Sequence, residues 1–127
     1  MLRANQSIVI HAARDLRLES RDIVKPGPGE VLINVQAGGI CGSDLHYYQH
    51  GGFGPIQLRE PMILGHEVSG LVAALGAGID NLEIGQLVAI SPSRACHSCS
   101  YCVQDQKNHC LNMQFCVPAS LVQLIAR

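Results

Sequence analysis

The chain lacks tryptophan and has few other aromatic residues, with two phenylalanines and three tyrosines among 127 residues. Stacking of bases or sugars on aromatic side chains is therefore hardly available, and the core has to be built from Val, Ile, Leu and Ala. An excess of either charge is also lacking, because nine Lys and Arg face ten Asp and Glu and the net charge is −1. Since no basic face is available to follow a phosphate backbone, we expect no nucleic acid partner.

Long apolar runs are absent as well. The N-terminal run from Ile8 to Ile10 is broken by His11 and Arg14, so it does not form the apolar region of a signal peptide. No stretch approaches the roughly 20 apolar residues of a membrane span. We therefore expect a protein of the cytoplasm with no membrane partner. The length suits one domain and leaves no room for a second complete one.

The first half of the chain alternates in the manner of β-strands. Val31, Ile33 and Val35 share one face, which predicts a half-buried strand after the Pro- and Gly-rich turn at 25–30. Further runs of strand type, separated by Gly, Pro, Asn or Asp, lie at 7–11, 16–20, 68–75 and 86–91. Short strands with frequent turn signals indicate a mainly β barrel or sandwich.

One short helix is expected over 43–49. Ser43 would be its N-cap, and Asp44 would stand in the first turn, where the helix dipole favours a carboxylate.

Four cysteines define the strongest motif, Cys96-x2-Cys99-x2-Cys102-x7-Cys110. The surrounding lobe, residues 94–111, has no hydrophobic period, so metal ligation would have to order it. The spacing favours a closed, structural tetrahedral zinc site. An iron–sulfur cluster is the first alternative, although the bacterial motif continues with x3-Cys-Pro; free thiols or disulfides are the other.

A second constellation lies in glycine-rich breaks of the chain and comprises Cys41, His66 and Glu67. Taken singly, Cys41 could be a small buried apolar residue, His66 a loop histidine with hydrogen-bond partners, and Glu67 a charge exposed to solvent. Taken together, a thiolate, an imidazole and a carboxylate fit a zinc site with three protein ligands and an open fourth position.

Three ordered segments carry a family resemblance: GGICGSDLHYY, EPMILGHEVSGLVAALGAGI and the four-cysteine lobe. They resemble the N-terminal catalytic domain of zinc-dependent medium-chain alcohol dehydrogenases over residues 7–114. The segments CGSDLHYYQ, SPSRACHSCSYC and NHCLNM are most similar to the polyol branch and to L-idonate 5-dehydrogenases. The resemblance implies a GroES-like fold, a partial β-barrel with short helices and a four-cysteine zinc loop.

The resemblance also implies two zinc ions. Cys41, His66 and Glu67 match ligands of a catalytic zinc, with Glu67 a ligand in polyol dehydrogenases but not in other branches. Asp44 matches the carboxylate that bonds the ligand histidine and fixes its ring. Cys96, Cys99, Cys102 and Cys110 match the ligands of a structural zinc.

Three further residues match positions on the path of the substrate and its proton. Ser43 matches the hydroxyl that contacts the alcohol, and His46 matches the outer member of a proton relay. Tyr47 aligns with a tyrosine of the substrate pocket. The implied catalytic residues are thus Ser43 and His46.

The activity implied by the resemblance is oxidation of a secondary alcohol of a polyol or sugar acid with NAD or NADP. L-idonate, oxidised to 5-ketogluconate, is the favoured substrate, and intact family members form homo-oligomers. The alternatives are a zinc-binding module without catalysis and a dehydrogenase of the sorbitol or threonine type.

The chain has no Gly-x-Gly-x-x-Gly segment, so we expect no Rossmann domain in it. Residues 1–115 read as an incomplete catalytic domain and residues 116–127 as an atypical tail. These features predict a truncated chain that is inactive by itself, with exposed strand edges that favour aggregation.

Overall fold

The structure is a computed structural model that describes residues 5–115 and 123–125. In these residues one α-helix, α1 (Gly42–His50), and two short 3-10 helices, η1 (Cys102–Gln104) and η2 (Lys107–His109), accompany eleven strands. The strands are β1 (Asn5–Ala12), β2 (Asp15–Arg21), β3 (Glu30–Gly38), β4 (Gly52–Phe53), β5 (Ile56–Gln57), β6 (Met62–Ile63), β7 (Val68–Leu75), β8 (Leu87–Ala89), β9 (Ser93–Arg94), β10 (Gln114–Phe115) and β11 (Gln123–Ile125). The predicted mainly β fold with short helices is confirmed.

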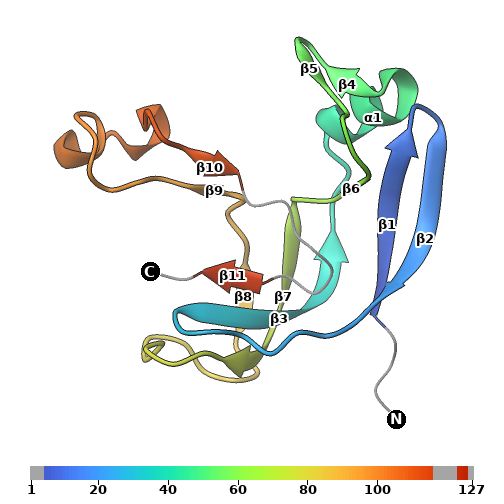
Figure 1. Cartoon of the computed structure of the whole chain (residues 1–127). Helices are drawn as coiled ribbons and strands as arrows, with labels where there is room; N and C mark the ends of the chain where they lie inside the picture. The colour runs from blue at the N-terminus through green and yellow to red at the C-terminus, as the bar shows by residue number, and fades with distance from the viewer. Residues whose placement is uncertain (1–4, 116–122, 126–127) are drawn as a thin grey trace.

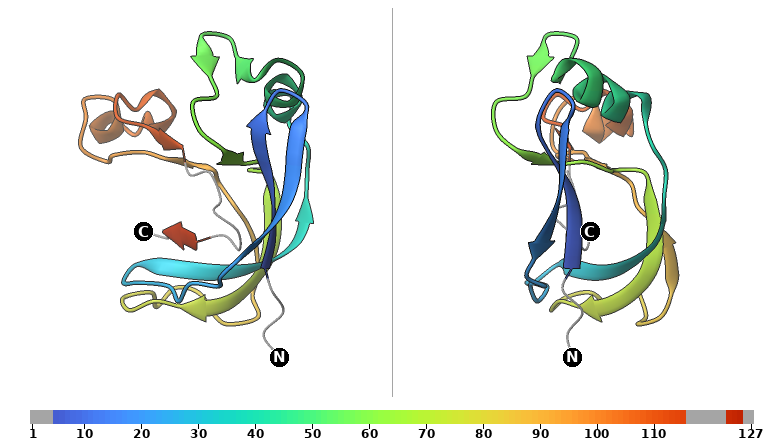
Figure 2. Two further views of the ribbon diagram at one scale, coloured as in Figure 1. Left: turned by 45° about the vertical axis from the view of Figure 1, so that its right-hand side comes forward. Right: turned by 90° about the vertical axis from the view of Figure 1, so that its right-hand side faces the viewer.

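The strands form curved, incompletely closed sheets. The largest has the order β11-β3-β7-β8, and a three-stranded sheet has the order β2-β1-β6 (Figure 1). Two strand pairs, β4–β5 and β9–β10, stand apart from them. Figure 2 shows β3 and β7 bending away from the β1–β2 hairpin, so that the sheets form part of a barrel.

The main core lies on β3 and β7, where Val31, Ile33 and Val72 are each 1% exposed. Partly buried hydrophobic residues pack against these three: Val68, Leu75, Ile79, Leu82, Val88 and Ile90. β-Branched residues dominate because they fit the pleated surface of a sheet. The core is therefore aliphatic, as the composition predicts.

The predicted half-buried strand is present as β3, but Val35, on the same predicted face as Val31 and Ile33, is 38% exposed. Val35 is paired with Gly70, which offers no side chain to cover it, and the β3–β7 register shifts just after this point. A side chain at position 70 would collide with the backbone of Asn34, so glycine is required there.

The other predicted strands are present with changed limits. The runs at 7–11 and 16–20 lie within β1 and β2, and the run at 68–75 is β7. The run at 86–91 is shorter than predicted, because β8 covers only Leu87–Ala89. Ile8 and Leu18, paired across the β1–β2 hairpin, are more than half exposed and leave apolar surface on its outer face.

The helix begins earlier than predicted, and its N-cap is Cys41 rather than Ser43. The carboxylate of Asp44 accepts a hydrogen bond of 3.0 Å from the Cys41 N–H, which satisfies a donor at the helix start. The helix ends at His50 and is capped by Gly51, whose left-handed backbone (φ 69°) lets its N–H donate to the Tyr47 carbonyl.

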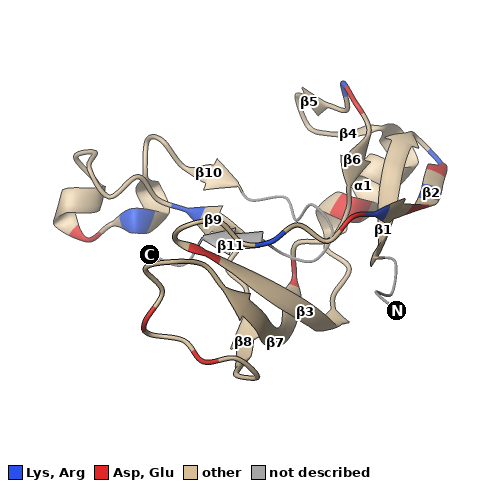
Figure 3. Cartoon of the chain, turned by 60° about the horizontal axis from the view of Figure 1, so that its bottom comes forward, with Lys and Arg blue, Asp and Glu red and all other residues tan. Residues whose placement is uncertain are grey.

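In the predicted tail, 116–127, only β11 belongs to the described residues, where it pairs with β3. The rest of the tail lies outside the described residues. Figure 3 shows acidic and basic residues scattered along the ribbon, and on β2 Arg17 pairs with Asp15 and Arg21 with Glu19. In the described part of the chain, every helix is too short or too polar to cross a bilayer.

Candidate active site and metal centres

The pairing of β3 with β7 brings two distant parts of the sequence together. The strands are antiparallel, and Gly38 at the end of β3 is paired with Val68 at the start of β7. The residues that follow β3 and those that precede β7 therefore meet at one edge of the sheet. Just beyond the ladder, the Gly39 N–H donates a 2.7 Å hydrogen bond to the Glu67 carbonyl.

This edge gathers Cys41, His66 and Glu67. One possible ligand atom from each, a sulfur, a ring nitrogen and a carboxylate oxygen, lies within 4.8 Å of the other two. Cys41 and His66 are partly buried, whereas Glu67 is exposed. A thiolate, an imidazole and a carboxylate are ligands that zinc accepts, and three of them leave a fourth position for a substrate. The residues present thus fit a catalytic zinc.

Asp44 contacts this group from α1. Its Oδ1 lies 3.7 Å from His66 Nδ1, and its Oδ2 accepts the hydrogen bond from the Cys41 backbone. Both side chains are largely buried. A carboxylate beside one ring nitrogen of a ligand histidine sets the tautomer and leaves the other nitrogen free for a metal.

A cavity of about 410 Å³ opens beside His66. Ser43, Asp44, Tyr47 and His66 supply polar groups to its wall. The remaining wall is apolar and consists of Phe53, Ile56, Met62, Ile63, Leu64, Gly65 and Phe115. Such a cavity, apolar with a few convergent polar groups, is typical of a small-molecule site.

The structure separates the predicted proton-path residues. Ser43 and Tyr47 line the cavity, but His46 lies outside its wall, exposed on α1. Ser43 and His46 are three residues apart and so are neighbours on the helix surface. The arrangement leads from the cavity toward solvent.

Sequence reasoning missed Phe115 as a wall residue. Its ring meets the His66 ring edge-on, with centroids 5.6 Å apart. Phe115 reaches this place because β10 pairs with β9, where Phe115 is opposite Ser93. Nothing local in the sequence signals this position, because it depends on that strand pairing.

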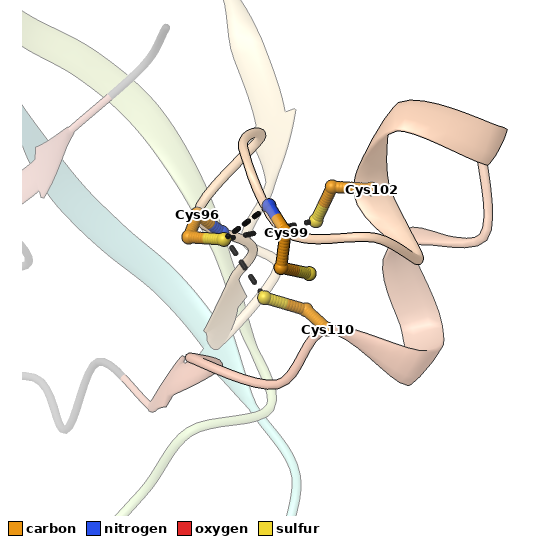
Figure 4. A group of neighbouring side chains, drawn as sticks. All are labelled: Cys96, Cys99, Cys102 and Cys110. Carbon is orange, nitrogen blue, oxygen red and sulfur yellow. Dashed lines mark hydrogen bonds between the residues drawn. The ribbon is translucent and has the colours of Figure 1, made fainter.

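The four-cysteine lobe extends from the β9–β10 pair, away from both sheets (Figure 1). One sulfur from each of Cys96, Cys99, Cys102 and Cys110 lies within 4.8 Å of the others. Figure 4 shows these four side chains gathered from the loop after β9, from η1 and from the end of η2. A hydrogen bond between Arg94 and Gln114 joins the two strands at its base.

Backbone N–H groups point at the sulfurs of this lobe. Cys99 donates to Cys96 Sγ at 3.3 Å, and Cys96 donates to Cys110 Sγ at 3.2 Å. Asn112 also donates to Cys110 Sγ, at 3.4 Å. Such bonds favour thiolates, the form that binds metals.

The thiols differ in acidity. Hydrogen bonds from Ser98, Asn112 and the Cys99 backbone lower the pKa of Cys96 to about 5. Burial raises the pKa of Cys102 to about 12. The hydrogen bonds thus favour the thiolate form of Cys96, whereas burial favours the protonated form of Cys102, so ligation of a metal by Cys102 would release a proton.

The sulfur spacing fits tetrahedral zinc. Two Zn–S bonds of about 2.3 Å at a tetrahedral angle place their sulfurs about 3.8 Å apart. Cys96 Sγ and Cys102 Sγ are 4.0 Å apart. The lobe thus fits a closed structural site.

A partial β-barrel that carries a thiolate, imidazole and carboxylate group beside a four-cysteine lobe defines the class of the zinc-dependent medium-chain dehydrogenases. The alcohol dehydrogenase GroES-like domain matches residues 27–124, and the chain belongs to this family. Members of the family bind zinc and NAD(P).

The relatives found include polyol dehydrogenases. Sorbitol dehydrogenase of Gallus gallus is 46% identical over 112 residues, which are 88% of this chain and 32% of the relative. The crystal structure of L-idonate 5-dehydrogenase from Escherichia coli K-12 matches with 41% identity and a TM-score of 0.70, over 87% of this chain and 31% of that one. An alcohol dehydrogenase from Escherichia coli CFT073, complexed with NADH, matches with 33% identity and a TM-score of 0.76, over 89% of this chain and 32% of that one. The chain thus spans about a third of the length of its relatives.

Proposed function

We propose that this chain is the part of an NAD(P)-dependent polyol dehydrogenase that binds the alcohol and the catalytic zinc. The observation that carries the proposal is the convergence of Cys41, His66 and Glu67 within 4.8 Å, beside a cavity of about 410 Å³. These three residues would hold the ion, and the four-cysteine lobe would hold a second, structural one.

The catalytic zinc, when bound, would act as a Lewis acid that polarises the alcohol oxygen and lowers its pKa. The residues of the chain have separate tasks around it. Asp44, whose Oδ1 lies 3.7 Å from His66 Nδ1, would orient the His66 ring once a small rotation closes this contact to a hydrogen bond. Ser43, in the cavity wall, would accept the hydroxyl proton, and His46, exposed three residues later, would pass it to solvent.

The cavity supports a neutral polyol better than a sugar acid. Ser43 and Tyr47 offer hydroxyl groups to a substrate, and the described wall residues include neither Lys nor Arg. The carboxylate of L-idonate would need a cation from elsewhere. We therefore place sorbitol and related neutral polyols first, and L-idonate as the second substrate candidate suggested by the relatives.

The nicotinamide cofactor would receive the hydride, which is chemistry of the cofactor rather than of the protein. Because these 127 residues contain no Gly-x-Gly-x-x-Gly segment, protein beyond them would have to bind the dinucleotide. The second candidate function is a zinc-binding module without catalysis, which the four sulfurs of the cysteine lobe, within 4.8 Å of one another, would support without any substrate.

Metal content and polyol binding test the proposal on the chain as it stands. Mass spectrometry of the native protein should find two zinc ions per chain, falling to one in Cys41→Ser and to one in Cys99→Ser. After substitution of the ions by cobalt, sorbitol should change the visible spectrum of the wild type and of Cys99→Ser but not that of Cys41→Ser. Two ions with no response to sorbitol or L-idonate would support the non-catalytic module instead.

A further inference from the structure

Two histidines on α1 face solvent and belong to neither metal group. His46 and His50 are both exposed and are four residues apart, so they stand in one row on the helix surface. Their ring centroids are 6.1 Å apart, and the ring planes are inclined by 34°. Neither ring lines the cavity among the residues named for its wall.

The separation suits two imidazoles on one ion. A metal–nitrogen bond of about 2.1 Å places the ring centre about 3.2 Å from the metal. Two such rings have centres between about 4.5 Å apart at a right angle and about 6.4 Å apart in line. The observed 6.1 Å lies inside this range, near its wide end, and rotation of the exposed His50 side chain can shorten it. Paired histidines at this helical spacing are an established way to bind a divalent transition metal.

We propose that His46 and His50 form a third, solvent-exposed site for a divalent transition metal ion with affinity for imidazole, such as Ni²⁺. Water would complete the coordination, so this site binds more weakly than a set of three or four protein ligands.

The surroundings make the site partly preorganised. The His46 ring lies against Phe53, with centroids 5.4 Å apart, which restricts its rotation. His50 stands in the last turn of α1, where the helix dipole favours a cation. The end of the helix is held in place because the Arg14 N–H donates a 2.7 Å hydrogen bond to the Tyr48 carbonyl.

Titration with Ni²⁺ of protein already loaded with zinc tests this site. Nuclear magnetic resonance of the histidine rings should show His46 and His50 broadening together, before the other four histidines. Calorimetry should show that His50→Ala weakens Ni²⁺ binding about tenfold or more, or about 1.4 kcal/mol. The matched control is Gln49→Ala, which changes the neighbouring exposed residue and should leave the affinity unchanged.

Other outcomes would overturn the proposal. These are simultaneous broadening of all exposed histidines, broadening of only one of the pair, or equal affinity in His50→Ala and the wild type. Circular dichroism of each variant checks that α1 remains folded. The ring signals of the unmodified protein give the same answer without any substitution, and they do not depend on the dehydrogenase proposal.

Discussion

Asp44 Oδ1 lies 3.7 Å from His66 Nδ1, while the other oxygen of the same carboxylate accepts a hydrogen bond from the Cys41 backbone. A single side chain on the first turn of α1 therefore contacts both partly buried members of the proposed catalytic metal group. The contact with His66 is longer than a hydrogen bond, and a small rotation of either side chain would close it.

Replacing Asp44 by Asn should weaken zinc binding at Cys41, His66 and Glu67 by about 10- to 100-fold, because the charge that orients His66 is lost. Competition with a chelator measures this affinity. Asp22→Asn, at an exposed position, is the control and should have no effect. An unchanged affinity in Asp44→Asn would show that the carboxylate serves only the helix start.

A side chain at position 39 should displace Glu67. An added Cβ at Gly39 would lie 2.9 Å from Glu67 Oε2, closer than such contacts allow. Gly39→Ala should therefore weaken zinc binding at the first group but not in the cysteine lobe. Gly42→Ala meets nothing within 4 Å and should leave zinc binding unchanged. Equal loss in both variants would mean that the effect is one of general folding.

Cys99→Ser and Ser43→Ala should separate metal binding from proton transfer. Cys99→Ser removes one ligand of four, so it should lower the bound zinc by one ion and disorder the lobe. Ser43→Ala should keep both ions, since its hydroxyl lies in the cavity wall. Elemental analysis measures the metal, and the same loss in the two variants would contradict this division.

Removal of zinc by a chelator should loosen the lobe and spare the main sheet. The amides of Cys99 and Asn112 donate to sulfur, so their hydrogen exchange should accelerate when the sulfurs lose the metal. The amides of β3 and β7 should exchange as before, because Ile33 and Val72 are buried without any ligand. Exchange that accelerates throughout the chain would contradict a local role for the metal.

Ile33→Val should lower the free energy of unfolding by about 1 kcal/mol, because one methylene is removed from a side chain that is 1% exposed. Urea denaturation measures the change. Ile84→Val, at a side chain that is 70% exposed, is the matched control and should stay close to the wild type. An equal change in the free energy of unfolding in both variants would contradict the assignment of Ile33 to the core.

Local patterns predicted the longer strands, β1, β2, β3 and β7, and the cysteine lobe, but not the short strands β4, β5, β6, β9, β10 and β11. Alternation of Val31 with Ile33 marks a strand because both side chains bury against one layer. Cys96, Cys99 and Cys102 lie so close in sequence that short turns alone can direct their sulfurs to one point.

The remaining features of the site could not be predicted from local sequence, because they depend on the pairing of strands that are distant in the chain. The meeting of Cys41 with His66 depends on the register of β3 against β7, which residue spacing does not reveal; the family resemblance suggested it. Ser43 is the better N-cap by general preference, yet the helix starts at Gly42 because Asp44 satisfies the Cys41 N–H. The place of Phe115 required the pairing of β9 with β10.

The pairing of β9 with β10 connects the four-cysteine lobe to the wall of the cavity. Phe115 lies on β10, directly after the lobe, and its ring contacts the His66 ring, so a change in the lobe would be transmitted to one wall of the cavity. An ion bound only by the four cysteines would thereby help to shape a cavity that it does not touch.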